Sequence, residues 1–368
     1  MSKTPKQGLF DISMVCLRLG CIGFGGIAGM VSLIESEIVS KRRWISRDEY
    51  LDAVSAANLI PGPNSVEIIM HCAHEKGGKP ALVAGGLCYI LPSMVICLLW
   101  AVLYTQYGHL PAVQPFLYGI APATIAVIIK AVFKLSGSIG RRPHIIFLSV
   151  LVLAGALCGI NEVALLFIAA IAGALFINRK KFYSIFPAPF LFVNASSPGK
   201  LFFIFLKIGA ILYGSGYVLF AYLDDALVQH NHWLTRQQLT DAISAGQLTP
   251  GPILSSATFA GYLIQGTAGA LLATAAIFLP SFFIAFFLSR ILRFINRHKM
   301  LRDFLDVANG ASVALIAAVA LRMLPAVAMQ WQTALIFGLS LVVIFFTKIN
   351  TGLLIISGGV FGYLLCLL

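Results

Sequence analysis

Two Pro-Gly-Pro tripeptides are the first candidates for a binding site in this sequence. They lie 189 positions apart, each inside an apolar stretch, and consist of Pro61, Gly62 and Pro63 and of Pro250, Gly251 and Pro252. Because proline lacks an N–H and clashes with the preceding turn, neither stretch can continue as a regular helix. The helix that restarts after each break presents free N–H groups next to Asn64 and Ser65, or to Ser255 and Ser256, and such helix ends favour anions. The alternative is a pair of proline kinks that only shape packing.

Two basic residues occupy matching positions in apolar segments. Arg18 and Lys207 each lie about eight residues into their segment, which at ~1.5 Å per residue is roughly 12 Å deep. Since an ionisable residue in a bilayer is costly, the pair is interpreted as a clamp for an anion, with snorkelling to the headgroups as the alternative. The glycine-rich runs that follow them come after no strand, so they are not nucleotide-binding loops. They add Gly25, Gly26, Gly214 and Ser215 to the candidate binding site, or else serve close helix packing or a hinge.

A single acidic residue follows the first tripeptide. Glu67 has Ser256 at the matching position of the second half. Its carboxyl group could bind and release a proton, because burial and neighbouring charges shift a carboxyl pKa, or it could be the structural partner of a Lys or Arg. His71, Cys72, His74 and Glu75 follow on the same segment, but further ligands at a recognised spacing are missing. The sequence therefore predicts neither a metal site nor a cofactor.

The composition of the chain indicates that these residues lie on membrane helices. Hydrophobic residues make up 59% of the 368-residue chain, charged residues 11%, and the mean hydropathy is +0.91. A chain of this length holds at most about a dozen spans of roughly 20 residues, which leaves no room for a soluble catalytic domain. The formal charge of +12 lies in loops, where the positive-inside rule explains it without nucleic acid as a partner. We therefore predict an all-α, multi-pass protein of the cell inner (plasma) membrane, surrounded by the lipid bilayer.

The chain is an internal repeat. Residues 17–63 align without a gap with residues 206–252, and 15 of these 47 positions are identical. Such self-similarity indicates two homologous structural units. We predict a first repeat over residues 10–177, a cytoplasmic linker over 178–198, and a second repeat over 199–368.

Loop charges predict how the two repeats cross the membrane. If the tripeptide segments re-enter rather than span, and if the first apolar run, residues 10–36, crosses from an outside N-terminus, most loop Lys and Arg residues fall inside. Each half then has five crossings, so the halves are inverted relative to each other. The expected fold has about ten spanning helices plus two broken or re-entrant segments. Inverted repeats with broken helices that meet near the midplane are typical of secondary transporters.

Several motifs resemble those of the chromate ion transporter family, over nearly the full chain. In the second half the resemblance lies in residues 205–209 (Phe-Leu-Lys-Ile-Gly), 213–219 (Tyr-Gly-Ser-Gly-Tyr-Val-Leu), 233–235 (Trp-Leu-Thr), 246–252 (Gly-Gln-Leu-Thr-Pro-Gly-Pro) and 257–262 (Ala-Thr-Phe-Ala-Gly-Tyr). In the first half it lies in residues 17–20, 24–26, 42–44 and 61–65.

This resemblance implies export of chromate, a tetrahedral dianion close to sulfate, by alternating access, with chromate resistance as the result. The direction agrees with physics, because a negative interior favours outward movement of two negative charges by roughly 4 to 5 kcal/mol per 100 mV. A carrier of sulfate or another small oxyanion, proton-coupled through Glu67, is the alternative. A membrane enzyme acting on a lipid is another class, but the sequence shows no nucleophile or metal constellation for it. The partners expected are the oxyanion, lipid and, in one version, a second copy of the chain in a homodimer.

Overall fold

The computed structural model describes residues 8–23, 26–110, 113–137, 142–177, 199–213, 216–328, 330–347 and 349–366. All regular elements among these residues are helices, as predicted. The first half contains α1 (Leu9–Ile22), α2 (Gly26–Ile34), the π-helix η1 (Glu35–Lys41), α3 (Arg47–Leu59), α4 (Asn64–Tyr107), α5 (Gln114–Ser136), α6 (Pro143–Leu157) and α7 (Glu162–Ile177). The second half contains α8 (Lys200–Ile211), α9 (Val218–Leu223), the π-helix η3 (Asp224–His230), α10 (Arg236–Leu248), the short η4 (Ile253–Ser255), α11 (Ser256–Arg297), α12 (Lys299–Ala328), α13 (Trp331–Phe346) and α14 (Thr351–Cys366). The segment 178–198, predicted as a cytoplasmic linker, lies outside the described residues.

The repeat extends to the caps of individual helices. In α3 the Ser46 hydroxyl accepts a hydrogen bond from the Glu49 N–H, while the Glu49 carboxylate accepts one from the Ser46 N–H. Thr235 and Gln238 form the same reciprocal pair at the start of α10, 189 positions later. Each pair satisfies two backbone N–H groups that have no partner within the helix. The two halves thus begin these helices by the same local mechanism.

Removing either cap should cost the same small amount of stability. We expect Ser46→Ala and Thr235→Ala each to lower the free energy of unfolding by about 1 kcal/mol, because each leaves helix N–H groups unpaired. Thermal unfolding of the purified protein in detergent measures the loss, and Ser136→Ala, at an exposed position near the end of α5, is the control. A loss confined to one of the two caps would contradict their equivalence.

The first apolar run of each half folds back instead of crossing straight. The run over residues 10–36 leaves helical geometry at Gly23, the C-cap of α1, and the matching residue, Leu212, is the C-cap of α8. In the second half the Lys200 ammonium lies 5.6 Å from the centre of the Trp233 ring. A straight helix would separate these two residues by about 50 Å. The structure therefore differs from the predicted single crossing, because the helix breaks halfway and the chain returns.

The second apolar run of each half also reverses. Glu49, at the start of α3, interacts electrostatically with His71 of α4, so α3 and the first turns of α4 lie side by side with residues 61–63 at their tip. Helix α4 then turns sharply at Gly78, where φ is 75°. α11 makes the equivalent turn at Gln265 and Gly266. The predicted broken or re-entrant segments thus take the form of helical hairpins.

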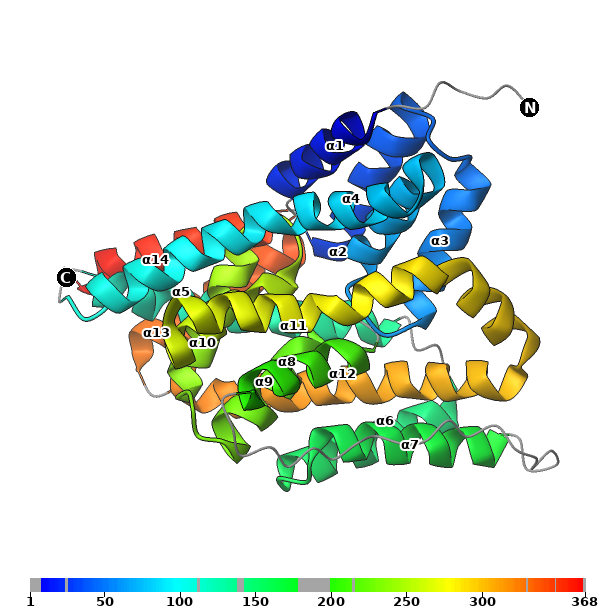
Figure 1. The fold of residues 1–368 in the computed structure, drawn as a ribbon. Coiled ribbons are helices and arrows are strands. Elements are labelled where there is room, and N and C mark those ends of the chain that lie inside the picture. The colour runs from blue at the N-terminus through cyan, green and yellow to red at the C-terminus, as the bar shows by residue number, and fades with distance from the viewer. Residues whose placement is uncertain are drawn as a thin grey trace.

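The long second parts of α4 and α11 run in opposite directions at the centre of the molecule. Lys79 lies over the ring of Phe286, whereas Gly86, further along α4, contacts Phe282, which is earlier in α11. Figure 1 shows the two helices, cyan and yellow, crossing the molecule next to each other. The largest apolar core draws residues from both halves, so this central contact is buried.

Length and composition show which helices are able to cross a membrane. Among the described residues, four helices are long and apolar enough to cross a membrane: Asn64–Tyr107, Gln114–Ser136, Ile253–Leu288 and Lys299–Pro325. Four shorter apolar helices, α6, α7, α13 and α14, accompany them. Large apolar side chains on outer faces are strongly exposed, for example Phe133, Phe147 and Phe283. Since such a surface is unfavourable in water, it faces lipid, and the chain is a multi-pass membrane protein. The predicted count of about ten crossings also assigned one crossing to the first apolar run of each half, which folds back here, so that count is not confirmed.

Candidate functional site

The two tripeptide loops, residues 61–63 and 250–252, each bond to the broken helix of the other half. The Gly62 N–H donates to the Leu212 carbonyl at 2.7 Å, and the Gly251 N–H donates to the Gly23 carbonyl at 2.8 Å. Gly62 and Gly251 are repeat equivalents, and so are Gly23 and Leu212. The exchange is therefore reciprocal, as a two-fold relation between the halves requires. It brings all four chain breaks to one place.

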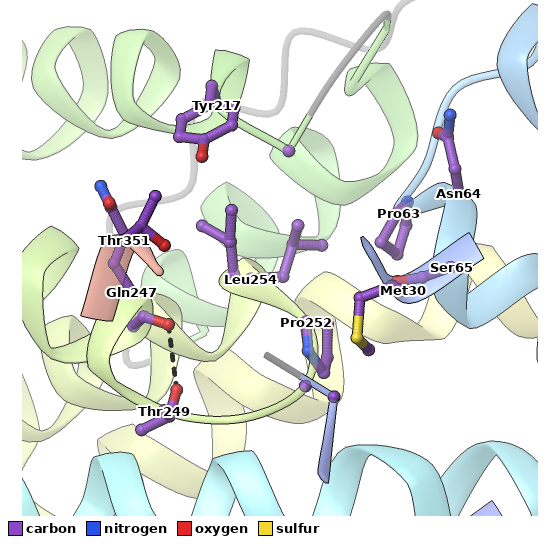
Figure 2. A pocket seen from close by; sticks show the side chains of 15 residues that line it. Met30, Pro63, Asn64, Ser65, Tyr217, Gln247, Thr249, Pro252, Leu254 and Thr351 are labelled. Atoms are coloured by element: carbon purple, nitrogen blue, oxygen red, sulfur yellow. Dashed lines mark hydrogen bonds between the residues drawn. The ribbon is translucent and has the colours of Figure 1, made fainter. Parts of the chain in front are cut away.

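A cavity of about 40 Å³ lies at this meeting point, with space for a few water molecules or one small ion. Figure 2 shows Met30, Asn64 and Ser65 of the first half on one side of it and Tyr217, Gln247 and Thr351 of the second half on the other. The complete lining consists of Gly23, Met30, Pro63, Asn64, Ser65, Gly216, Tyr217, Gly246, Gln247, Thr249, Gly251, Pro252, Ile253, Leu254 and Thr351.

The side chain of Gln247, which lines this cavity, has an unpaired amide group. It is buried, and neither its amide nitrogen nor its amide oxygen has a hydrogen-bond partner. The other polar groups are partly engaged: Asn64 donates to Asn58 at 2.6 Å, and the Thr249 hydroxyl donates to the Gly246 carbonyl at 3.0 Å (Figure 2). A buried amide without a partner costs about 1 to 3 kcal/mol. Such a group is expected where a ligand supplies the missing bonds.

The predicted cationic clamp does not line the cavity in this structure. Arg18 is exposed, and its guanidinium lies 3.7 Å from the Glu37 carboxylate in η1. A hydrogen bond from Lys41 at 2.8 Å, helped by the charges of Lys41, Arg18 and Arg42, lowers the pKa of Glu37. Lys207 is also exposed and interacts electrostatically with Asp225 in η3. Both cations thus meet a carboxylate on the π-helix of their own half.

The other predicted site residues divide into three groups. Pro63, Asn64, Ser65, Gly251 and Pro252 line the cavity, whereas Pro61 lines a separate groove, and Pro250 and Gly62 support the loops without lining it. Ser255 and Ser256 are buried just behind, with hydroxyls that donate to the Pro252 and Ile253 carbonyls. Gly26 begins α2, while Gly25, Gly214 and Ser215 lie outside the described residues.

Sequence reasoning missed Met30, Tyr217, Gln247, Thr249 and Thr351 at this site. One signal for Gln247 was present, because the aligned residue of the first half, Asn58, is also an amide. Two side-chain amides at matching positions before the tripeptides already indicated a polar site. Thr351 had no such signal, since it lies about 100 residues further along the chain.

Two larger cavities are less suited to an ion. Their volumes are about 260 and 530 Å³, and both are lined almost entirely by apolar and aromatic side chains. In the smaller one the carboxyl group of Asp241 is bonded to the Tyr104 hydroxyl at 2.8 Å, and in the larger one Arg290 stands at the edge. An ion in such surroundings would lose its hydration without gaining enough hydrogen bonds.

A buried ion cluster joins the halves away from this cavity. The Arg322 guanidinium of α12 lies 2.9 Å from the Glu162 carboxylate of α7 and 3.0 Å from the Asp224 carboxylate of η3. Arg322 also donates to the Ala156 carbonyl. The two carboxylates are buried almost completely. The cluster therefore fixes α7 of the first half to η3 and α12 of the second.

Comparison with known proteins agrees with this architecture. A chromate transporter family model matches residues 10–174 and again residues 199–363, which are the two repeats. The chain is 28% identical to the chromate transport protein of Cupriavidus metallidurans over 85% of this chain and 82% of the relative. It is 27% identical to a probable chromate transport protein of Synechococcus elongatus, over 86% and 84%, and 24% identical to the chromate transport protein of Pseudomonas aeruginosa, over 95% and 90%. No solved structure matches. The duplicated match covers most of the chain, and this multi-pass protein of the cell membrane belongs to the chromate transporter family.

Proposed function

We propose that the chain carries chromate, or a closely related tetrahedral oxyanion, across the cell membrane, and that the cavity between the tripeptide loops is its binding site. The observation that carries this proposal is the unpaired, buried Gln247 amide in a cavity lined by both halves. The names of the relatives supply the substrate class.

The cavity offers an oxyanion neutral hydrogen-bond donors. Gln247, Asn64, Ser65, Thr249, Tyr217 and Thr351 all carry N–H or O–H groups. The first N–H groups of α4 have no partner within the helix, and the positive end of the helix dipole points the same way. An anion held by neutral donors does not depend on a buried cation.

The two-fold exchange supports transport by alternating access between inverted halves. Repeat-equivalent helices α4 and α11 run antiparallel, and Lys79 near the start of one lies by Phe286 toward the end of the other. This places Lys76 and Lys79 at the same end of the molecule as Arg290, Arg297 and Lys299, which is the end that the positive-inside rule assigns to the cytoplasm. An interior-negative membrane potential favours export of a dianion, whichever way the carrier is inserted.

Flux into inverted membrane vesicles tests the function. Vesicles containing the protein should accumulate chromate when the interior is made positive, and excess sulfate should block the uptake. Vesicles without the protein are the control. If the vesicles take up sulfate but no chromate, the substrate is sulfate rather than chromate. If neither ion moves, the proposal is wrong.

Gln247→Leu separates binding from folding. Leucine has a similar volume but no amide, so we expect the apparent affinity for the anion to fall about tenfold, since one or two hydrogen bonds are lost. Thermal stability should stay equal or rise, because the amide has no partner in the unliganded protein. Gln114→Leu, at an exposed site in α5, is the matched control. Unchanged affinity in Gln247→Leu would remove this residue from the site.

Arg18 and Lys207 are proposed to attract the anion from outside the cavity, because both are exposed. The double variant Arg18→Gln with Lys207→Gln should raise the apparent KM a few-fold at low salt, and the difference should vanish at high salt as charges are screened. A clamp that closes on the bound anion predicts a different result. In that case transport would fall tenfold or more at every salt concentration.

A further inference from the structure

Glu67 is a buried acidic residue that has no role in the oxyanion site proposed above. Its side chain is completely buried in α4, and neither carboxyl oxygen has a hydrogen-bond partner. Among the described residues it forms no ion pair with any Lys, Arg or His. An ionised carboxylate without partners in such a place would cost several kcal/mol. In the conformation described, Glu67 therefore holds its proton.

The carboxyl group lies directly behind the first tripeptide loop. A Cβ atom placed on Gly62 would be 1.8 Å from Glu67 Oε1, so the acid packs against this glycine. The next loop residue, Pro63, lines the cavity. The matching residue of the second half is Ser256, whose hydroxyl bonds to the Ile253 carbonyl. The two-fold site thus has one acid, on one side only.

No charged group is fixed against the Glu67 carboxyl group in the described part of the chain. Its two oxygens make neither an ion pair nor a hydrogen bond, and the atom they pack against is the Gly62 backbone. His71, one turn further along α4, interacts electrostatically with Glu75, His74 and Glu49 rather than with Glu67.

An anion in the adjoining cavity makes ionisation of Glu67 still less favourable. Like charges close together in a low-dielectric site repel strongly, so the site accepts the anion together with the proton and releases them together. We propose that Glu67 is the proton-binding site of this carrier and that one proton travels with each oxyanion. The proton is taken up by the carboxylate from the side where the anion enters and returns to water where the anion leaves. A dianion with one proton moves a single net negative charge.

This inference rests on the proposed function. Sulfate is the probe used to test it. Sulfate keeps its double charge between pH 6 and pH 9, whereas chromate does not. In proteoliposomes of the full chain, the affinity for sulfate should fall about tenfold per pH unit above the pH at which Glu67 loses its proton, because the binding form is protonated. Glu67→Gln mimics that form permanently. It should bind sulfate with an affinity that is independent of pH, and it should move no protons.

Glu75→Gln is the matched control, since Glu75 lies on the same helix but is half exposed. It should behave like the wild-type protein. Proton movement is followed by a pH-sensitive dye inside the vesicles. If Glu67→Gln keeps the pH dependence or still moves protons, the inference is wrong.

The wild-type protein provides a second measurement that does not depend on the folding of a variant. Above the pH at which Glu67 of the unliganded protein loses its proton, addition of sulfate to the purified protein in weakly buffered detergent should raise the pH. The form that binds is protonated, so binding takes up protons to a limit of one per site. Sulfate binding without proton uptake at any pH would overturn the inference and leave the proposed function intact. Absence of any anion binding or transport would overturn the proposed function itself.

Discussion

Arg322→Gln is expected to lower the free energy of unfolding by about 3 to 5 kcal/mol, more than either cap variant. The guanidinium bonds to Glu162 and Asp224, which are almost fully buried. Without it, two carboxylates stay buried with less compensation, although Asp224 keeps Arg236 at 3.6 Å. Thermal or denaturant unfolding in detergent measures the loss.

Arg47→Gln is the control for this prediction. Arg47 and Glu35 are the repeat equivalents of Arg236 and Asp224, and they form an ion pair at 3.3 Å, but the Arg47 side chain is 75% exposed. An exposed pair contributes about 0 to 1 kcal/mol, so this variant should be nearly neutral. The double variant Arg322→Gln with Glu162→Gln should recover part of the stability. Equal effects of Arg322→Gln and Arg47→Gln would show that burial does not govern these pairs.

Gly62→Ala should reduce transport about 100-fold with little loss of protein from the membrane. Gly62 has a φ of 141°, which side chains rarely adopt and which costs about 1 to 3 kcal/mol for alanine. The added methyl group would also collide with Glu67 Oε1. Displacing this carboxyl group, together with the hydrogen bond from Gly62 to Leu212, disturbs the loop that forms the cavity. Initial rates of anion uptake, normalised to protein content, measure the effect.

Gly159→Ala separates backbone strain from the collision. Gly159, between α6 and α7, has a φ of 81°, but nothing lies within 4 Å of an added Cβ. The Gly159→Ala variant should therefore be somewhat less stable than the wild-type protein but transport the anion at the same rate. Gly251→Ala is expected to fall between the two, because the nearest atom to its Cβ is the Ser93 Cβ at 3.2 Å. If Gly159→Ala loses transport as severely as Gly62→Ala, strain alone explains the result.

The fold class, the repeat and the positions of the chain breaks follow from local properties of the sequence. Apolar composition requires helices in a bilayer, because backbone groups there must bond within their own segment. The prolines at 61, 63, 250 and 252 dictate interruptions, because their rings and missing N–H groups act locally. Capping residues such as Ser46 and Thr235 also act over three or four positions. Effects of such short range can be read directly from a sequence.

Which of these residues share a site depends on long-range packing and could not be predicted from the sequence. The contacts of Gly62 with Leu212 and of Gly251 with Gly23 cross between halves, and no periodicity in the sequence encodes the angle at which the halves meet. Depth along a helix placed Arg18 near the midplane, but the turn after Gly23 brings it to Glu37 instead. Gln247 became a candidate because its amide is buried without a partner, and burial depends on the packing of both halves. Side-chain direction and long-range packing are properties of the folded chain, so they had to come from the structure.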